Sequence, residues 1–240
     1  MKKNRFFKLF KAYFIRFKLH RLVNPFSELF IYLGHLSNLS KYIAQNKSKF
    51  VFNDFFNAAP DFEKRTELYE YLLQHVLPDA PLNFLEFGVY KGKSLKWWLE
   101  NHKNPESKFL GFDTFTGLPE KYGNYEAGTF SLEGAIPDLG DSRCHMVKGL
   151  FQDTALTTFK SVDFSRLTIF HIDVDLYSAA HFVLACIYPY LKKGDIIMFD
   201  EFGVPLHEFR AFQDFRSSFY VNLEPIGAKN NYLAVAFKVV

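Results

Sequence analysis

Residues 83–94 read NFLEFGVYKGKS, and this stretch decides the fold. It opens with a short apolar run typical of a buried strand, and a helical pattern runs from Lys93 to Asn101. Between the two, Gly88 and Gly92 leave room for a ligand to approach the backbone, and the N-terminus of the helix offers its free N–H groups. The stretch therefore predicts a strand, a binding turn and a helix, the first unit of an α/β fold.

Three kinds of ligand-binding turn compete for this glycine pattern. A dinucleotide-binding turn needs G-x-G-x-x-G, but position 86 is Glu. A phosphate-binding P-loop needs G-x-x-x-x-G-K-[ST]; Gly92-Lys93-Ser94 fits its end, but Gly88 lies one residue too close. An acid beside the glycines would repel phosphate and instead suits a cationic or hydroxyl-bearing ligand, such as the amino acid end of S-adenosylmethionine. A plain strand-to-helix turn has the same pattern, so the turn alone does not decide between these alternatives.

Downstream of this turn, strand patterns alternate with helix patterns. Strand-like runs occupy residues 108–113, 145–148, 167–173 and 195–200, and helical runs occupy 61–77, 178–191 and 206–217. Two late strands are expected near residues 219–223 and 232–239, joined by a tight turn at 227–230. The alternation predicts a parallel, doubly wound α/β sheet that ends in an antiparallel edge strand. The long connection from Pro119 to Asp141 is expected to be a lid or a binding loop.

Asp113 ends the second predicted strand, about 25 residues past Gly88. An acid at this place in a nucleotide-binding sheet commonly holds ribose hydroxyls. An Asp that only caps the following turn would look the same in the sequence.

Two pairs of acids follow the fourth and fifth predicted strands. Asp173 and Asp175 lie in IFHIDVDLYSA, and Asp200 and Glu201 lie in IIMFDEFG. The carboxyl ends of adjacent parallel strands are where open α/β sheets bind ligands. Converging carboxylates repel one another unless a cation or a proton lies between them, and oxygen-rich sites favour Mg²⁺, Ca²⁺ or Mn²⁺ over Zn²⁺.

These acids have simpler explanations as well. Asp173 or Asp175 could cap the next helix, and Glu201 could point to water. Because side chains alternate along a strand, Asp173 and Asp175 are expected on one face, so that one could bind a metal while the other acts on the substrate. His171 is interpreted as a core residue rather than a ligand.

The N-terminal region has a basic, amphipathic character. Eight of the 29 Lys and Arg residues lie within residues 1–22, which contain no acid, so the rest of the chain has 21 basic against 26 acidic residues. Aromatic and aliphatic residues recur there at helical spacing between the basic ones. Two arrangements are compatible with this helix: it packs on its own domain or on a sister subunit of a homo-oligomer, as amphipathic helices most commonly do, or it contacts an anionic membrane surface or an acidic partner.

Length and composition limit the class of protein. A chain of 240 residues with 48% hydrophobic residues and 30 Phe suits one globular domain with an appendage. We therefore divide it into an N-terminal helical extension, 1–60, and a main globular domain, 61–240. No apolar stretch is long enough to span a membrane, and Cys144 and Cys186 are too few for a disulfide framework. A cytoplasmic protein with no nucleic acid partner is expected, and a peripheral location at the inner face of the membrane is the alternative that residues 1–22 leave open.

Five segments carry a resemblance to a known family. They are LEFGVYKGKS, GFDTFTGLP, VKGLFQDT, IFHIDVDLYSA and KKGDIIMFDEFG, within residues 82–216. Together they resemble the macrocin O-methyltransferase (TylF/MycF-like) family of class I S-adenosylmethionine-dependent methyltransferases. The resemblance implies a seven-stranded Rossmann-like sheet, S-adenosylmethionine as cofactor, Mg²⁺ or another hard divalent cation, and a sugar or glycosylated acceptor.

The resemblance also assigns roles to residues of this sequence. The residues expected to bind the cofactor are Glu86, Gly88, Tyr90, Gly92, Ser94 and Asp113. Asp173, Asp200 and Glu201 match the metal ligands, and Asp175 matches the proposed general base. The family usually has Asp-Asp where this chain has Asp200-Glu201, so Glu201 is the weakest of the three ligands. The rival hypotheses are a P-loop-like enzyme that handles phosphates or nucleotides and a non-catalytic docking protein with a methyltransferase fold.

Overall fold

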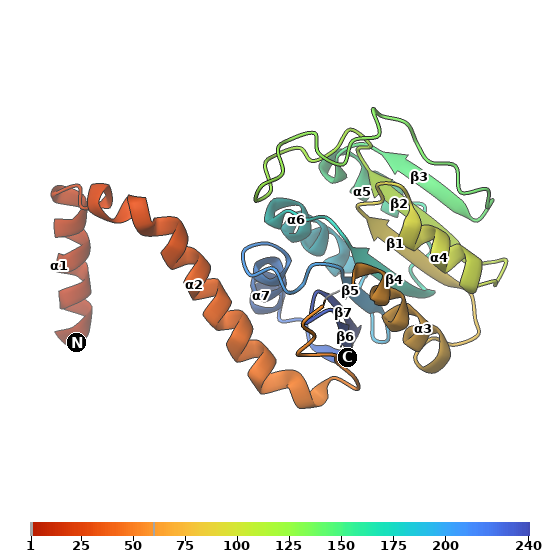
Figure 1. Ribbon diagram of the computed structural model, residues 1–240, viewed down its shortest axis with the longest axis horizontal. Helices are drawn as coiled ribbons and strands as arrows, with labels where there is room; N and C mark the ends of the chain where they lie inside the picture. The colour runs from red at the N-terminus through yellow and green to blue at the C-terminus, as the bar shows by residue number, and fades with distance from the viewer. Residues whose placement is uncertain (1, 60) are drawn as a thin grey trace.

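The computed structural model describes residues 2–59 and 61–240, and its centre is a seven-stranded sheet (Figure 1). The strands lie in the order β3-β2-β1-β4-β5-β7-β6. Their bounds are β1 Leu82–Phe87, β2 Lys108–Asp113, β3 Cys144–Lys148, β4 Leu167–Ile172, β5 Ile196–Phe199, β6 Leu223–Lys229 and β7 Ala234–Val239. The first strand, β1, lies inside the sheet. Strands β2 and β3 extend the sheet from β1 to one edge, and β4 to β7 build the other half on the other side of β1, which is the doubly wound arrangement.

All pairings from β3 to β5 are parallel, and β7 is antiparallel to both of its neighbours. This confirms the predicted mostly parallel, Rossmann-like α/β sheet. The antiparallel strand lies one position in from the edge, because β6 occupies the edge itself. The inner strands β1, β4 and β5 are almost wholly buried, since helices cover both of their faces.

Helices form one layer on each face of the sheet. On one face lie α3 (Arg65–His75) and α4 (Lys93–Asn101), and on the other lie α5 (Phe151–Phe159), α6 (Tyr177–Ile187) and α7 (Glu208–Phe219). The α3–α4 layer packs on the sheet through Tyr69 and Trp98, while Phe212 and Phe237 stack in the opposite layer. Helix α5 was not predicted, and the predicted helix 61–77 is a 3-10 turn, Phe62–Lys64, followed by α3.

The late part of the chain differs from the prediction. Helix α7 continues to Phe219. Phe215 and Phe219 lie on the same face of this helix and pack together, and Phe219 also packs against Tyr188 of the 3-10 turn Tyr188–Tyr190. Strand β6 therefore begins at Leu223, and Gly227 lies inside it rather than in a turn. The Phe52 ring packs on Gly227, where a Cβ atom would stand 2.5 Å from the ring.

The glycine turn and the end of β4 meet at the carboxyl edge of the sheet. The backbone N–H of Asp173 donates to the carbonyl of Phe87 at 2.9 Å. A Cβ atom on Gly88, which has φ +88°, would stand 1.7 Å from the carbonyl oxygen of Asp173. Only glycine permits this approach, so β1 and β4 deliver their acids to the same place.

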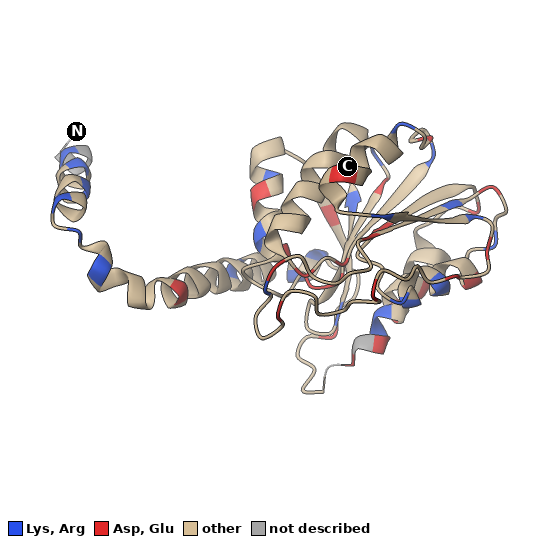
Figure 2. Cartoon of the chain, turned by 90° about the horizontal axis from the view of Figure 1, so that it is seen from above, with Lys and Arg blue, Asp and Glu red and all other residues tan. Residues whose placement is uncertain are grey.

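The N-terminal residues form an arm that extends away from the sheet (Figure 1). It consists of α1 (Lys2–Arg16) and α2 (His20–Asn46), followed by the 3-10 turn Lys47–Lys49. The C-terminal end of α2 docks on the body, where Tyr42 packs against Phe202, Phe209 and Phe212. The arm's charges are almost all basic toward its N-terminal end (Figure 2). No described helix is long and apolar enough to cross a lipid bilayer.

Candidate active site

A cavity of about 650 Å³ opens at the carboxyl edge of the sheet. Six of the predicted site residues line it: Gly88, Tyr90, Ser94, Asp113, Asp173 and Asp175. The other four, Glu86, Gly92, Asp200 and Glu201, lie behind or beside this lining. The structure thus brings the glycine turn, the acid after β2 and the acids after β4 to one cavity.

Asp113 holds the glycine turn in place. One of its carboxylate oxygens accepts the backbone N–H groups of Val89 and Tyr90, each at 2.8 Å, and the other accepts that of Phe115 at 2.7 Å. The capping role considered from the sequence is therefore present. The side chain is only partly buried and still faces the cavity, so its remaining acceptor capacity is open to a ligand hydroxyl.

Glu86 lies under the turn and is fully buried. Its Oε1 accepts the hydroxyl of Ser94, and His171 Nδ1 lies 3.2 Å from the same oxygen. Its Oε2 has no hydrogen-bond partner among the described residues. Since Ser94 bonds to a buried acid and Lys93 pairs with Glu63 at 3.0 Å, the turn does not resemble a phosphate cradle.

Asp173 and Asp200 approach each other from the ends of neighbouring strands, and Arg65 lies between them. Its Nη1 is 2.5 Å from Asp200 Oδ2 and 3.4 Å from Asp173 Oδ2. The sequence indicated that a cation was needed at these carboxylates, and the structure supplies a guanidinium. Burial and the neighbouring Asp200 raise the pKa of Asp173 well above its usual range, although Arg65 opposes the effect.

His171 completes the group of atoms that could hold a metal ion. One atom from each of His171, Asp173 and Asp200 lies within 4.8 Å of the other two. His171 is buried, and neither of its ring nitrogens has a hydrogen-bond partner among the described residues. These donors fit a divalent cation, with an imidazole in addition to the carboxylates expected from the sequence.

Glu201 points away from this group, toward the long loop. Its carboxylate accepts the hydroxyl of Tyr122, and its backbone N–H donates to Glu208 Oε2 at 2.9 Å. Glu208 is fully buried, and its other oxygen accepts the N–H of Val174 at 3.3 Å. One carboxylate therefore joins the loop after β4 to the loop after β5.

Asp175 lies beyond the end of β4, which stops at Ile172, so strand alternation does not set its direction as predicted. Its backbone is left-handed, with φ +60°, which turns it out of line with Asp173. Burial, with the charges of Glu201, Asp200 and Asp113, raises the pKa of Asp175 to about 7. A carboxyl group of this kind can accept a proton near neutral pH.

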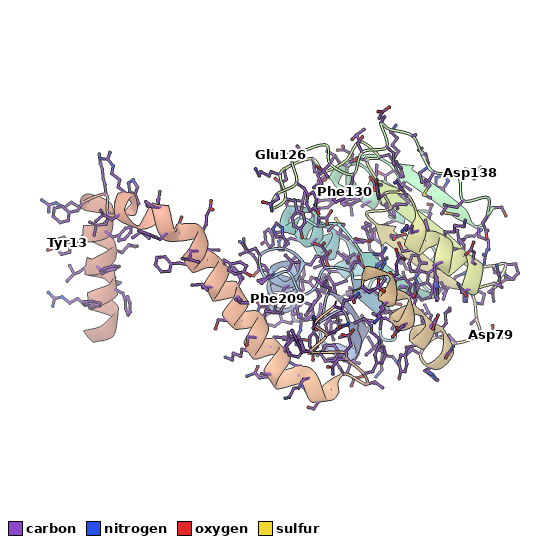
Figure 3. All side chains as sticks on the ribbon, viewed as in Figure 1. Tyr13, Asp79, Glu126, Phe130, Asp138 and Phe209 are labelled. Atoms are coloured by element: carbon purple, nitrogen blue, oxygen red, sulfur yellow. The ribbon has the colours of Figure 1, made fainter. Side chains whose placement is uncertain are left out.

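The loop between β2 and β3 lines one side of the cavity, and Phe130 is the aromatic residue that it contributes to the lining. Phe130, labelled in Figure 3, lies 5.7 Å from the ring of Tyr90 and 5.2 Å from that of Tyr125. Tyr122 stacks near Tyr125 and meets the His207 ring edge-on at 4.7 Å. That the long connection is a lid or a binding loop stays a prediction.

Arg65, Tyr122 and Glu208 were missed from the sequence. Each acts across more than one element, and none belongs to a short motif. Arg65 had no signal in the sequence, because its partners Asp173 and Asp200 lie 108 and 135 residues further along the chain.

A seven-stranded sheet of this order, with a glycine turn and an acid after β2, has the architecture of a class I methyltransferase. Residues 135–238 match the family model of the macrocin O-methyltransferases (TylF), which confirms the predicted resemblance. Over these residues, which make up less than half of the chain, it is similar to that family of O-methyltransferases. The match includes both acid-bearing strand ends.

Solved structures share the fold. The calicheamicin methyltransferase CalS11 is 21% identical with a TM-score of 0.56, and the alignment covers 86% of this chain and 91% of that one. The O-methyltransferase NovP is 20% identical with a TM-score of 0.54, covering 74% and 78%. A second structure of CalS11, described as a TDP-rhamnose 3'-O-methyltransferase, is 20% identical with a TM-score of 0.50, covering 86% and 93%. No curated protein matches the chain.

Proposed function

We propose that the protein is a divalent-metal-assisted O-methyltransferase that acts on a hydroxyl group of a sugar or glycosylated acceptor. The observation that carries this proposal is the single cavity at which the glycine turn, Asp113, Asp173 and Asp175 meet. A cofactor site and an acidic reaction site at the same opening are what methyl transfer to a hydroxyl group requires.

The cofactor part of the proposal rests on the glycine turn. Gly88, Tyr90 and Ser94 line the cavity, and Asp113 faces it for ribose hydroxyls. The space beside Gly88 is taken by the carbonyl of Asp173, which corrects the expectation that this glycine leaves room for a ligand. Glu86 contributes a negative charge directly beneath the turn, which suits the ammonium group of an amino acid. S-adenosylmethionine, once bound there, supplies the methyl group.

The metal part of the proposal rests on the donor atoms. Asp173 and Asp200 would hold the ion, His171 lies within reach of it, and Glu201 would have to turn from Tyr122 to join them. When bound, a divalent cation supplies positive charge that lowers the pKa of an acceptor hydroxyl. Asp175, which lines the cavity, would accept the proton of that hydroxyl.

The acceptor part of the proposal rests on the family and on the loop. The matching family is named for the methylation of macrocin, and one CalS11 structure is described as a TDP-rhamnose 3'-O-methyltransferase. Aromatic rings such as Tyr125 and Phe130 suit the apolar faces of a sugar or of a ring attached to it. A small-molecule or glycan acceptor is therefore proposed.

The arm extends the proposal to location. We propose that residues 1–22 bind the inner face of an anionic membrane, as part of an extension, 1–60, attached to a cytoplasmic methyltransferase domain, 61–240. Phe6, Phe10 and Tyr13 are more than half exposed, and these apolar side chains alternate with basic ones. A homo-oligomer formed through the same helices is the competing arrangement.

Calorimetry with S-adenosylmethionine and with ATP tests the assignment. Binding of S-adenosylmethionine in the micromolar range and no heat with ATP is the expected result. ATP binding alone would support the P-loop hypothesis, and no binding of either would support the docking protein. Methyl transfer that is unchanged after exhaustive EDTA treatment would remove the metal from the proposal.

A further inference from the structure

Arg65 occupies a position that a bound metal would need. The ion pairs of Asp173 and Asp200 are both made with its Nη1, at 3.4 and 2.5 Å. All three side chains are largely buried: the exposed fraction is 19% for Arg65, 24% for Asp173 and 9% for Asp200. The same two carboxylates, with His171, form the one metal-competent group among the residues that the structure describes.

We propose that the Arg65 guanidinium and a divalent cation exclude each other at Asp173 and Asp200. In the metal-free protein Arg65 is the resident counter-cation of the two acids, and it must swing aside for the ion to bind. This inference rests on the proposed function, because it adds a control on metal loading to the same site.

Two effects make the guanidinium and the metal ion exclude each other: both are positively charged, and both need the same carboxylate oxygens. A divalent ion binds Oδ atoms that Arg65 now contacts, so the two cations would share ligands at a few ångströms from each other. Arg65 cannot relieve the repulsion by losing its proton, since a guanidinium stays charged in proteins. Partial burial weakens solvent screening, which makes the repulsion larger than it would be at the surface.

The position of Arg65 allows it to move. It is the first residue of α3, directly after the 3-10 turn Phe62–Lys64, and its side chain already lines the cavity. The carboxylates, in contrast, are fixed at strand ends, and Asp173 and Asp200 also donate their backbone N–H groups to Phe87 and Ile172. The guanidinium is therefore the part of the cluster that is displaced.

The test compares three variants of the full chain. Arg65→Met removes the charge and keeps the length of the side chain, and Arg65→Lys keeps the charge. Lys93→Met is the matched control, because Lys93 also lines the cavity but pairs with Glu63 instead of the two aspartates. Circular dichroism establishes that each variant is folded, and Arg65→Lys carries the comparison with the wild type if Arg65→Met does not fold.

Mn²⁺ affinity is measured by calorimetry and by the electron paramagnetic resonance of free Mn²⁺. Arg65→Met is expected to bind Mn²⁺ at least tenfold more tightly than the wild type, and Lys93→Met within twofold of it. Arg65→Lys should bind Mn²⁺ more weakly than Arg65→Met does. Relative to the wild type, Arg65→Lys should bind Mn²⁺ no more than threefold more tightly. In thermal unfolding without metal, the Tm of Arg65→Met should be lower than that of the wild type, because the unpaired carboxylates of Asp173 and Asp200 repel each other. Added Mn²⁺ should raise the Tm of Arg65→Met again.

The outcomes separate this inference from the proposed function. Equal, measurable Mn²⁺ affinities for Arg65→Met and the wild type, or an Arg65→Lys chain that binds tenfold more tightly than the wild type, would overturn the exclusion and leave the metal role intact. Tighter binding by Arg65→Met together with EDTA-insensitive methyl transfer would support the exclusion and refute metal assistance. No Mn²⁺ binding by either chain would overturn both.

Discussion

The carbonyl oxygen of Asp173 lies 1.7 Å from the point where a Cβ atom on Gly88 would stand. This close approach joins the proposed cofactor-binding turn to the first of the proposed metal ligands, and it leaves no space for any other residue at position 88. The obstacle is backbone, which cannot rotate away as a side chain can.

Gly88→Ala is therefore expected to cost about 2–4 kcal/mol of unfolding free energy, from the left-handed backbone and the forced separation of β1 and β4. Urea denaturation measures the loss, and S-adenosylmethionine affinity should fall with it. Gly194→Ala is the control, since Gly194 has φ +100° but meets no atom within 4 Å of the added Cβ. Equal losses for the two variants would contradict the role of the Asp173 contact.

Asp175→Asn is expected to lower turnover by about 10²–10⁴-fold, because the amide cannot accept a proton. S-adenosylmethionine affinity should stay within about twofold of the wild-type value if the residue acts only on the acceptor. Asp79→Asn provides a control: this exposed residue lies at the other edge of the sheet (Figure 3). Full activity of Asp175→Asn would assign the base elsewhere.

Asp200→Asn and Glu201→Gln should differ in metal affinity. Asp200 shares Arg65 with Asp173, whereas Glu201 is bound to Tyr122. Mn²⁺ affinity is expected to fall more than about 100-fold for Asp200→Asn and by less than about tenfold for Glu201→Gln. The reverse order would show that Glu201 leaves Tyr122 and becomes a main ligand.

Asp141 should make stability depend on pH. Hydrogen bonds from Arg143 lower the pKa of Asp141 from 3.8 to about 2, and Arg143 also holds the backbone carbonyls of Leu99 and His102. Because the folded-state pKa is depressed, the stabilisation is present above about pH 4 and is lost as the pH falls toward 2.

Asp141→Asn is accordingly expected to lose about 1 kcal/mol at pH 7, with the difference from the wild type shrinking between pH 4 and pH 2. Urea denaturation at several pH values measures this. Asp138→Asn, in the same loop, is the control, since Asp138 accepts the N–H of Gly140. A pH-independent difference would rule out the ion pair as its cause.

The arm should bind anionic lipid. The intact chain is expected to sediment with vesicles containing about 30% phosphatidylglycerol, less so at 0.5 M salt, and not with neutral vesicles, because several basic residues lie beside exposed aromatic ones. A chain beginning at Asn24 should stay in solution. Equal binding by the two chains would exclude the arm as the contact, and a change in oligomeric state alone would favour the sister-subunit arrangement.

Local patterns were enough to predict the strands that carry the site. A strand end, a glycine turn and an acid after each strand are short-range features, so the amino-acid sequence alone places Gly88, Asp113, Asp173 and Asp175 at one edge of the sheet, where they line one cavity. The parallel order then followed from the alternation of strands and helices. The proposed roles of these residues stay predictions.

Side-chain partners across the fold could not be predicted in the same way. Arg65 is 108 residues from Asp173, and Tyr122 is 79 residues from Glu201. Nothing in the spacing of one segment reports on the other. The first late strand was displaced for a related reason: Phe219, where that strand was expected to begin, packs against Tyr188 and Phe215 and so continues α7. The second late strand lies where it was predicted.

Glu208 has a consequence for anyone who exchanges parts between related methyltransferases. Its two oxygens accept the backbone N–H groups of Val174 and Glu201. The loop after β4 and the loop after β5 are therefore both hydrogen-bonded to one side chain at the start of α7. A graft that carries in one loop alone would leave a buried carboxylate with half of its partners. Both loops and the first turn of α7 must therefore be transplanted together as one cassette.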